Sequence, residues 1–274
     1  MKRLIHQVFF ILLIFSNILL SQEKDFEKDK IQLINLARII LNGETDSIRT
    51  VANKEFYENL LTLLDTKKSY KYKFEDIEHV SILQPKDKMF KIFTWFLPYT
   101  NGQYEYFGII QKCKKNGKKC RIYELETKHK LNKQFANKKL EIDEWYGCLY
   151  YDVIEIKINK QKYYTLLGWD GNNNRTTKKI IDVLSLTKKT APVFGASIFN
   201  NTLKRIILEY SSKYPISLRY DKKLEYIVFD HIEPIDGISI NNFDIYAPNL
   251  SYDVFKKTDL GWQLETNIYL NNEK

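Results

Sequence analysis

The sequence predicts an α+β protein that is mainly β, with an N-terminal helical hairpin packed on an antiparallel β-meander. Three observations support this prediction. Apolar residues recur at helical spacing between residues 25 and 64, later segments are short runs rich in Tyr, Phe, Ile, Val and Thr, and turn signals separate these runs. We therefore expect one large sheet, twisted or partly closed, against which the two helices pack.

Residues 1–21 have the features of a signal peptide. Lys2 and Arg3 precede an apolar run over residues 8–20, and a small residue ends the segment. This arrangement matches the export pattern, and the run is short for a bilayer span. A buried core helix is the alternative. We expect cleavage to leave residues 22–274 as a single β-rich domain, periplasmic or secreted, without a membrane anchor of its own.

Residues 25–64 divide into two predicted helices. Apolar residues at three-to-four spacing lie on both sides of Asn42-Gly43, a pair that favours a helix end. Faces this apolar need a covering surface, and each fully buried Leu or Ile contributes about 1.5 to 3 kcal/mol. We therefore expect the hairpin to pack on the sheet.

The strands are predicted after the helical region. Asn, Asp and Gly pairs between the apolar runs favour tight turns, which join neighbouring antiparallel strands. The basic stretch 128–140 has little pattern and marks a weak internal boundary. The predicted strands are residues 89–97, 103–112, 119–126, 146–158, 162–169, 178–186, 193–199, 204–211, 217–220, 225–231, 252–257 and 261–268.

The charge balance argues against a nucleic-acid partner. The chain has 43 Lys and Arg against 34 Asp and Glu, a formal charge of +9, and the signs alternate along the sequence without forming a single basic stripe. An exported protein also rarely meets nucleic acid. We therefore expect a mildly basic surface and no nucleic-acid partner.

The three cysteines have different expected roles. Asn116-Gly117 favours a two-residue hairpin turn, which places Cys113 opposite Cys120 with Cα atoms about 5.5 Å apart. That separation suits a disulfide, and an oxidising compartment favours the bond. Two free thiols on a surface hairpin are the alternative. Cys148 is expected to be a small buried apolar residue.

Asp230, His231 and Glu233 are the best candidates for polar chemistry. In a strand, His231 and Glu233 project from the same face and could share a metal or a proton. The other histidines lie in unrelated segments, so a metal site is not expected, and a histidine bonded to a neighbour is the alternative.

The common catalytic motifs are missing from the sequence. It has no Gly-x-Ser-x-Gly turn, no glycine-rich phosphate loop and no His-Glu-x-x-His pair. We therefore expect no catalytic residue and no cofactor. A cryptic hydrolase that uses two carboxylates stays open as a secondary alternative.

Aromatic residues are the other candidates for a functional surface. They make up 14% of the chain, and Trp145, Tyr146 and Trp169 lie close in sequence to the polar Asp170 and Asn172. Such rings combine apolar area with a polar tip, so these five residues could form an interaction surface for a protein or a glycan. Core and cross-strand packing is the alternative reading.

Five segments carry the most distinctive residue patterns of the chain, namely residues 145–151, 164–172, 192–195, 218–221 and 229–231. Together they resemble a family of uncharacterised exported proteins from gliding-type bacteria that carry the type 9 secretion system. This resemblance implies a periplasmic address and a non-catalytic protein that binds a protein partner at the outer membrane, such as a plug or accessory subunit of the secretion translocon. A glycan-binding module that uses Tyr and Trp platforms is the alternative.

Overall fold

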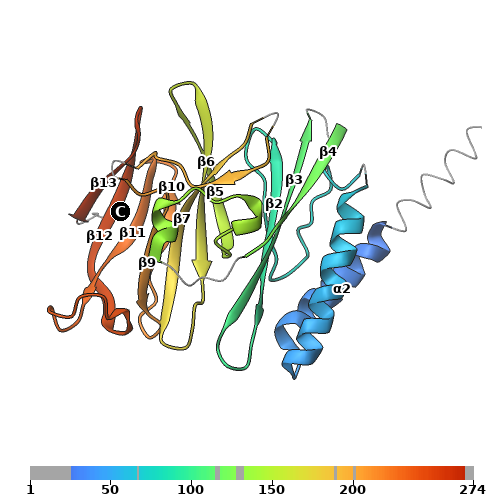
Figure 1. Cartoon of the computed structure of the whole chain (residues 1–274), viewed down its shortest axis with the longest axis horizontal. Helices are drawn as coiled ribbons and strands as arrows, with labels where there is room; N and C mark the ends of the chain where they lie inside the picture. Colours follow the sequence, from blue (N-terminus) through green and yellow to red (C-terminus); the bar gives the residue numbers. More distant parts are fainter. Residues whose placement is uncertain are drawn as a thin grey trace, which may run out of the picture. The chain divides into compact units, whose positions relative to one another are not determined.

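A computed structural model of the 274-residue chain confirms a mainly β fold with an N-terminal helical hairpin (Figure 1). The described chain separates into two compact units, Met1–His79 and Val80–Lys274. The expected signal peptide, residues 1–21, lies outside the described residues. The structure describes residues 26–66, 68–114, 118–127, 133–187, 190–199 and 202–268.

The N-terminal unit contains two helices. The first covers residues 26–42 of the described chain, and the second, α2, is Asp46–Leu64. Thr45 caps α2, because its side-chain oxygen accepts a hydrogen bond from the Ile48 amide at 3.3 Å. Gly43 separates the helices, and a Cβ there would lie 2.8 Å from a carbonyl oxygen of the first helix. The break therefore occurs where the sequence predicts it.

The turns after α2 fold back on the first helix. Tyr72 lies between Phe26 and Phe74, with ring centroids 4.5 and 5.1 Å away, both in edge-on geometry. Lys30 of the first helix forms an ion pair with Asp76. These contacts join the start of the first helix to the residues that follow α2.

The C-terminal unit contains three antiparallel sheets, whereas the sequence predicts one. The first sheet has the order β1-β2-β3-β4, the second has β5-β6-β7-β8 with β9 also paired to β7, and the third has β10-β11-β12-β13. The single sheet was wrong because tight turns join strands only within each group. Residues 126–148 and 212–217 connect one sheet to the next.

Most strand bounds agree with the sequence pattern. The pattern missed β1, and the predicted strand 193–199 contracts to a two-residue β8. The strands are β1 (Ser81–Leu83), β2 (Phe90–Pro98), β3 (Tyr104–Lys114), β4 (Lys118–Leu125), β5 (Leu149–Ile158), β6 (Gln161–Asp170), β7 (Thr176–Ser185), β8 (Val193–Phe194), β9 (Ile206–Ser211), β10 (Leu218–Asp221), β11 (Tyr226–Pro234), β12 (Tyr246–Thr258) and β13 (Gly261–Ile268). Short 3-10 helices are η2 (Lys133–Asn137), η3 (Ile142–Glu144) and η4 (Phe243–Ile245).

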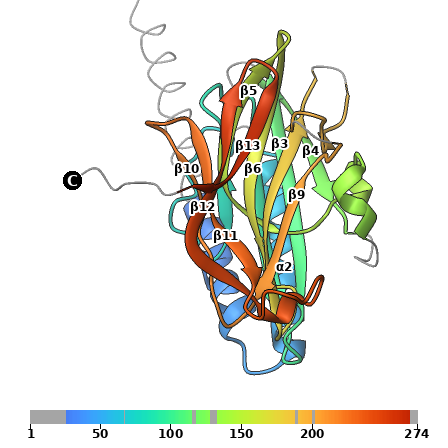
Figure 2. The same cartoon turned by 90° about the vertical axis from the view of Figure 1, so that its left-hand side faces the viewer.

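The second sheet lies between the other two. Leu166 packs in a core with Phe90 of the first sheet, whereas Leu167 packs in another core with Phe229 of the third sheet. Neighbouring residues of a strand point to opposite faces, so β6 supplies both cores. Figure 1 shows the third, second and first sheets in that order from left to right, and Figure 2 views them with the third sheet in front. Both faces of the middle sheet are therefore buried.

A disulfide joins Cys113 of β3 to Cys120 of β4, with Cα atoms 4.0 Å apart. The two strands change register here, and Lys119 has a φ of 51°. Lys119 and Cys120 together oppose Cys113, so the hairpin contains a β-bulge where the sequence predicts regular pairing. The predicted turn Asn116-Gly117 lies outside the described residues.

Candidate functional site

Trp145 and Tyr146 are buried, so they do not form the exposed platform that the sequence suggests. Their exposed fractions are 0% and 4%, and both belong to the core between the first and second sheets. Trp145 Nε1 donates to the Tyr150 hydroxyl at 3.1 Å, and the Tyr146 hydroxyl donates to Asp170 at 3.2 Å. Both rings are buried because the residues that lead into β5 pass between the first and second sheets.

Trp169 is the one partly exposed ring of the three predicted aromatic residues. Its ring centroid lies 5.4 Å from those of Phe96 on β2 and Tyr104 on β3. All three rings are half-buried. They form a small aromatic cluster at the edge of the core, which combines packing with a limited exposed surface.

Asp170 and Asn172 shape the turn between β6 and β7. Asp170 is fully buried, and its Oδ1 accepts the Asn172 amide at 2.9 Å. Asn172 has a φ of 53°, a conformation that asparagine tolerates better than most residues. Asn173 Oδ1 accepts the amides of Arg175 and Thr176 at 2.8 and 3.1 Å. We call residues 171–175 the asparagine loop.

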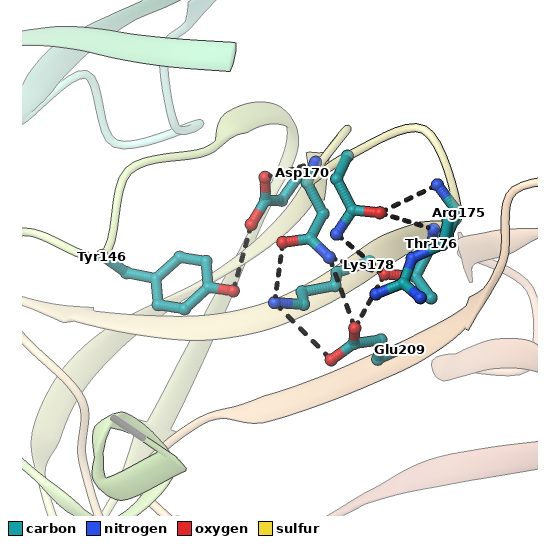
Figure 3. Close-up of polar contacts among 8 residues, drawn as sticks. Tyr146, Asp170, Arg175, Thr176, Lys178 and Glu209 are labelled. Carbon is teal, nitrogen blue, oxygen red and sulfur yellow. Dashed lines mark hydrogen bonds and ion pairs between the residues drawn. The ribbon is translucent and has the colours of Figure 1, made fainter. Parts of the chain in front are cut away.

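A polar network connects the asparagine loop to β9 (Figure 3). Glu209 lies opposite Lys178 in the pairing of β9 with β7, and their charged atoms are 3.5 Å apart. Lys178 also donates to Asn172 Oδ1 at 3.1 Å, while the Thr176 hydroxyl donates to Glu209 at 2.8 Å. Because these charged groups bind one another, the network fixes the hairpin and leaves little capacity for an external ligand.

Two tyrosine hydroxyls complete the buried side of this region. Tyr106 accepts the Gly171 amide at 2.7 Å, and Tyr146 donates to Asp170. Burial, followed by the nearby Asp170 carboxylate, raises the pKa of both phenols. Both therefore stay protonated at neutral pH and act as hydrogen-bonding supports. Sequence reasoning missed Tyr106, because only the packing of the first sheet on the second brings it here.

Asp230, His231 and Glu233 do not converge. Asp230 accepts the Ser217 amide at 2.7 Å, whereas His231 Nδ1 lies 2.8 Å from Asp253 Oδ1 on β12. Glu233 is exposed, and it lies opposite Ala247 in the pairing of β11 with β12. The register of β11 on β12 shifts between Asp230 and Ile232, so the predicted alternation of faces is broken there. Asp230 and His231 therefore bind separate neighbours, and His231 matches the alternative of a histidine bonded to a nearby side chain.

The described chain contains no cluster of metal-ligating side chains. Over residues 26–268, apart from the gaps given above, no three His, Cys, Asp or Glu side chains are grouped so that they could hold a metal ion. Cys148 is buried and takes no part in the disulfide. A Cβ on Gly168 would lie 2.8 Å from its sulfur, so the thiol is in close contact with β6.

A buried ion pair occupies the core beneath η2. Asp182 and Arg205 have no exposed side-chain surface, and Arg205 Nε donates to Asp182 Oδ1 at 3.2 Å. Asp182 also accepts the Tyr150 hydroxyl at 2.9 Å, and Arg205 donates to the carbonyls of Phe135 and Lys138. The pair therefore ties the segment around η2 to the middle sheet.

Three strongly exposed isoleucines lie on the loop between β11 and β12. Ile235, Ile238 and Ile240 are 60, 82 and 82% exposed. We call residues 235–245 the isoleucine loop, which extends from the lower left of the unit in Figure 1. Sequence reasoning assigned it no role, because the exposure of these side chains depends on the fold.

Hydrogen bonds within the isoleucine loop hold its turn in place. Asp236 Oδ1 accepts the amides of Ile238 and Ser239 at 3.1 and 3.0 Å, and Gly237 has a φ of 67°. The base is closed by a bond from the Ile235 amide to the Ile245 carbonyl at 3.0 Å. The isoleucines are therefore presented on an ordered turn.

Neither described helix is both long enough and apolar enough to cross a membrane. No protein-family model, curated protein or solved structure matches this chain. The residues and their geometry are thus the basis for assigning a function.

Proposed function

We propose that this chain is a non-catalytic periplasmic protein that binds a protein partner at the outer membrane, as a plug or accessory subunit of a secretion translocon. The isoleucine loop is the single observation that supports the binding role. The charged start and apolar run of residues 1–21 support the export that this role requires.

The isoleucine loop has the properties of a docking element. Apolar side chains that water surrounds in the free protein gain about 1.5 to 3 kcal/mol each when a partner buries them. Ile238 and Ile240 can supply most of this gain, because each is 82% exposed. The hydrogen bonds to Asp236 order the turn before binding, which lowers the entropic cost of association.

Affinity capture tests the binding role. The tagged full-length chain and a variant with Ile235→Ser, Ile238→Ser and Ile240→Ser are expressed in the source cells and recovered in gentle detergent. We expect the native chain to retain one outer-membrane protein in stoichiometric amount, and the variant to lose it. Equal recovery by both chains, or none above background, contradicts the proposal.

Export is tested separately by mass spectrometry of cell fractions. The proposal expects a periplasmic form that begins near Gln22. Accumulation of the intact form that begins with Met1 in the cytosol would contradict it.

A glycan-binding role is the second candidate. The observation that favours it is the half-buried Trp169, which packs against Tyr104 and lies two residues before the asparagine loop in the sequence. Aromatic faces beside amide groups suit a sugar ring. A glycan array compares the native chain with Trp169→Ala and Trp169→Phe. Binding that the Phe variant keeps and the Ala variant loses supports this role, and equal background signals from all three contradict it.

A further inference from the structure

We infer that the isoleucine loop docks into an apolar groove of a protein partner whose rim carries Lys or Arg. This inference rests on the proposed function, because it names the chemistry of the partner. The loop is exposed and ordered, so its shape and charge in the free protein indicate the surface that complements it.

The charge of the isoleucine loop indicates the kind of partner surface that it complements. The chain as a whole carries a net charge of +9, yet the sequence from Glu225 to Phe255 contains no Lys or Arg. Glu233 and Asp236 are exposed beside the isoleucines. Hydrogen bonds from Ser239 and Ile238 hold the pKa of Asp236 below its usual value, so its carboxylate is charged at neutral pH. Arg175 pairs with Asp244 at 3.3 Å near the end of the loop, so the acidic groups beside the isoleucines are Glu233 and Asp236.

This pattern favours a protein groove over a lipid surface. A loop that inserts into an anionic membrane usually places Lys or Arg beside its apolar side chains, because they attract the lipid headgroups. Here Glu233 and Asp236 would be repelled by such headgroups. A groove with an apolar floor and a basic rim matches both the exposed isoleucines and the carboxylates.

Backbone strain on the same hairpin gives a second observation. Leu250 of β12 has a φ of 72° and is 89% exposed, a combination that is unfavourable for a bulky apolar residue. Asn249 Oδ1 holds this conformation by accepting the amide and hydroxyl of Ser251 at 3.1 and 2.7 Å. Strained residues of this kind concentrate at binding sites, where the surrounding structure maintains them.

The experiment separates the apolar contribution from the charged one. The complex captured under the proposed function is washed at NaCl concentrations from about 50 to about 500 mM, a range over which screening of exposed charges becomes strong. The variants are the triple Ile→Ser chain, Glu233→Gln with Asp236→Asn, and Leu260→Ser. Leu260 is the matched control because it is 80% exposed in the turn between β12 and β13, at the other end of β12.

The inference makes three expectations for the variants. The triple Ile→Ser chain loses affinity by about tenfold or more, as expected for a central apolar contact. Glu233→Gln with Asp236→Asn keeps the side-chain oxygens that accept the loop amides, and it weakens binding by about two- to fivefold at low salt with a flatter salt dependence. The Leu260→Ser chain binds as the native chain does.

Several outcomes would overturn the inference. If the triple Ile→Ser chain loses binding but the charge variant keeps native affinity and salt dependence, the partner rim is not basic, although the proposed function stands. If the Leu260→Ser chain loses as much binding as the triple Ile→Ser chain, the isoleucine loop is not the contact surface. If no chain retains a partner, both proposals fail. Circular dichroism establishes that each variant is folded.

Two further measurements test whether the isoleucine loop binds a lipid surface or a second copy of the chain. Sedimentation with phosphatidylcholine vesicles, and with vesicles that also contain phosphatidylglycerol, is expected to show no binding by the native chain. Sedimentation velocity is expected to show a monomer. Vesicle binding, or a dimer, that the triple Ile→Ser change abolishes would assign the loop to lipid or to a second copy and would overturn the inference.

Discussion

Removal of Arg205 is expected to destabilise the β unit strongly, because its charge pairs with Asp182 in a site without water access. The side chain of Arg205 is fully buried, and its guanidinium binds the Asp182 carboxylate and the carbonyls of Phe135 and Lys138. An Arg205→Met change fills much of the volume but leaves all three acceptors without this donor.

The size of the effect follows from the bonds that are lost. Breaking a buried ion pair by removing one partner typically costs about 3 to 5 kcal/mol. Asp182 keeps the Tyr150 hydroxyl at 2.9 Å and the Val183 amide at 2.8 Å, so the carboxylate is not stripped of all its donors. The bonds lost by the two carbonyls, worth about 1 kcal/mol each, are part of this cost and are not added to it. We expect a total loss of about 3 to 4 kcal/mol.

Urea unfolding followed by tryptophan fluorescence measures this loss. With a slope of about 2 kcal/mol per molar urea, the midpoint falls by roughly 1.5 to 2 M. Adding Asp182→Asn to Arg205→Met removes the unpaired charge, so the double variant should recover about 1 kcal/mol or more. A loss below about 1 kcal/mol in Arg205→Met, or an additive loss in the double variant, would refute the reasoning.

Three further predictions concern single side chains. Burial raises the pKa of Asp87, but bonds from Lys162 and Tyr164 outweigh it and lower the pKa overall. Asp87 therefore stabilises the fold above the unfolded pKa of about 3.9 and loses this effect as pH falls through the lower folded pKa. Asp87→Asn should cost about 1 kcal/mol at pH 7 and much less at pH 3 in urea titrations, and an equal cost at both would contradict this. Leu250→Asn should raise stability by up to about 1 kcal/mol, since asparagine tolerates the left-handed backbone, and a fall in the urea midpoint would refute the strain. Asn172→Ala should lower stability by about 1 to 2 kcal/mol and Asn172→Gly by less, because glycine regains the positive φ, and a larger loss for Gly would be inconsistent with this reason.

The elements of the fold could largely be predicted, because they depend on local pattern. The break at Asn42-Gly43 and the runs that form β6 and β7 are visible as apolar periodicity and turn residues within a few positions. The division into three sheets was not visible. The weak boundary over residues 128–140 lies between β4 and β5, but only packing shows that the chain changes layer there.

The candidate site was harder to predict than the fold. Asp170 and Asn172 were expected at a functional surface, and the structure places Asp170 in the interior with Tyr146. Glu209 and Lys178 carried no sequence signal, because their contact depends on the pairing of β9 with β7. The isoleucine loop was missed because exposure is a property of the folded surface.

The sequence by itself determined the helical hairpin, the mainly β character and most strand bounds, because spacing and turn chemistry act over a few residues. The tertiary structure alone decided which side chains are buried and which are exposed. Leu166 and Leu167 enter different cores, and Trp145 is buried while Ile238 is exposed. The physical reason is that burial depends on strand register and on the layer that covers each face, and both are set by contacts between residues far apart in the chain.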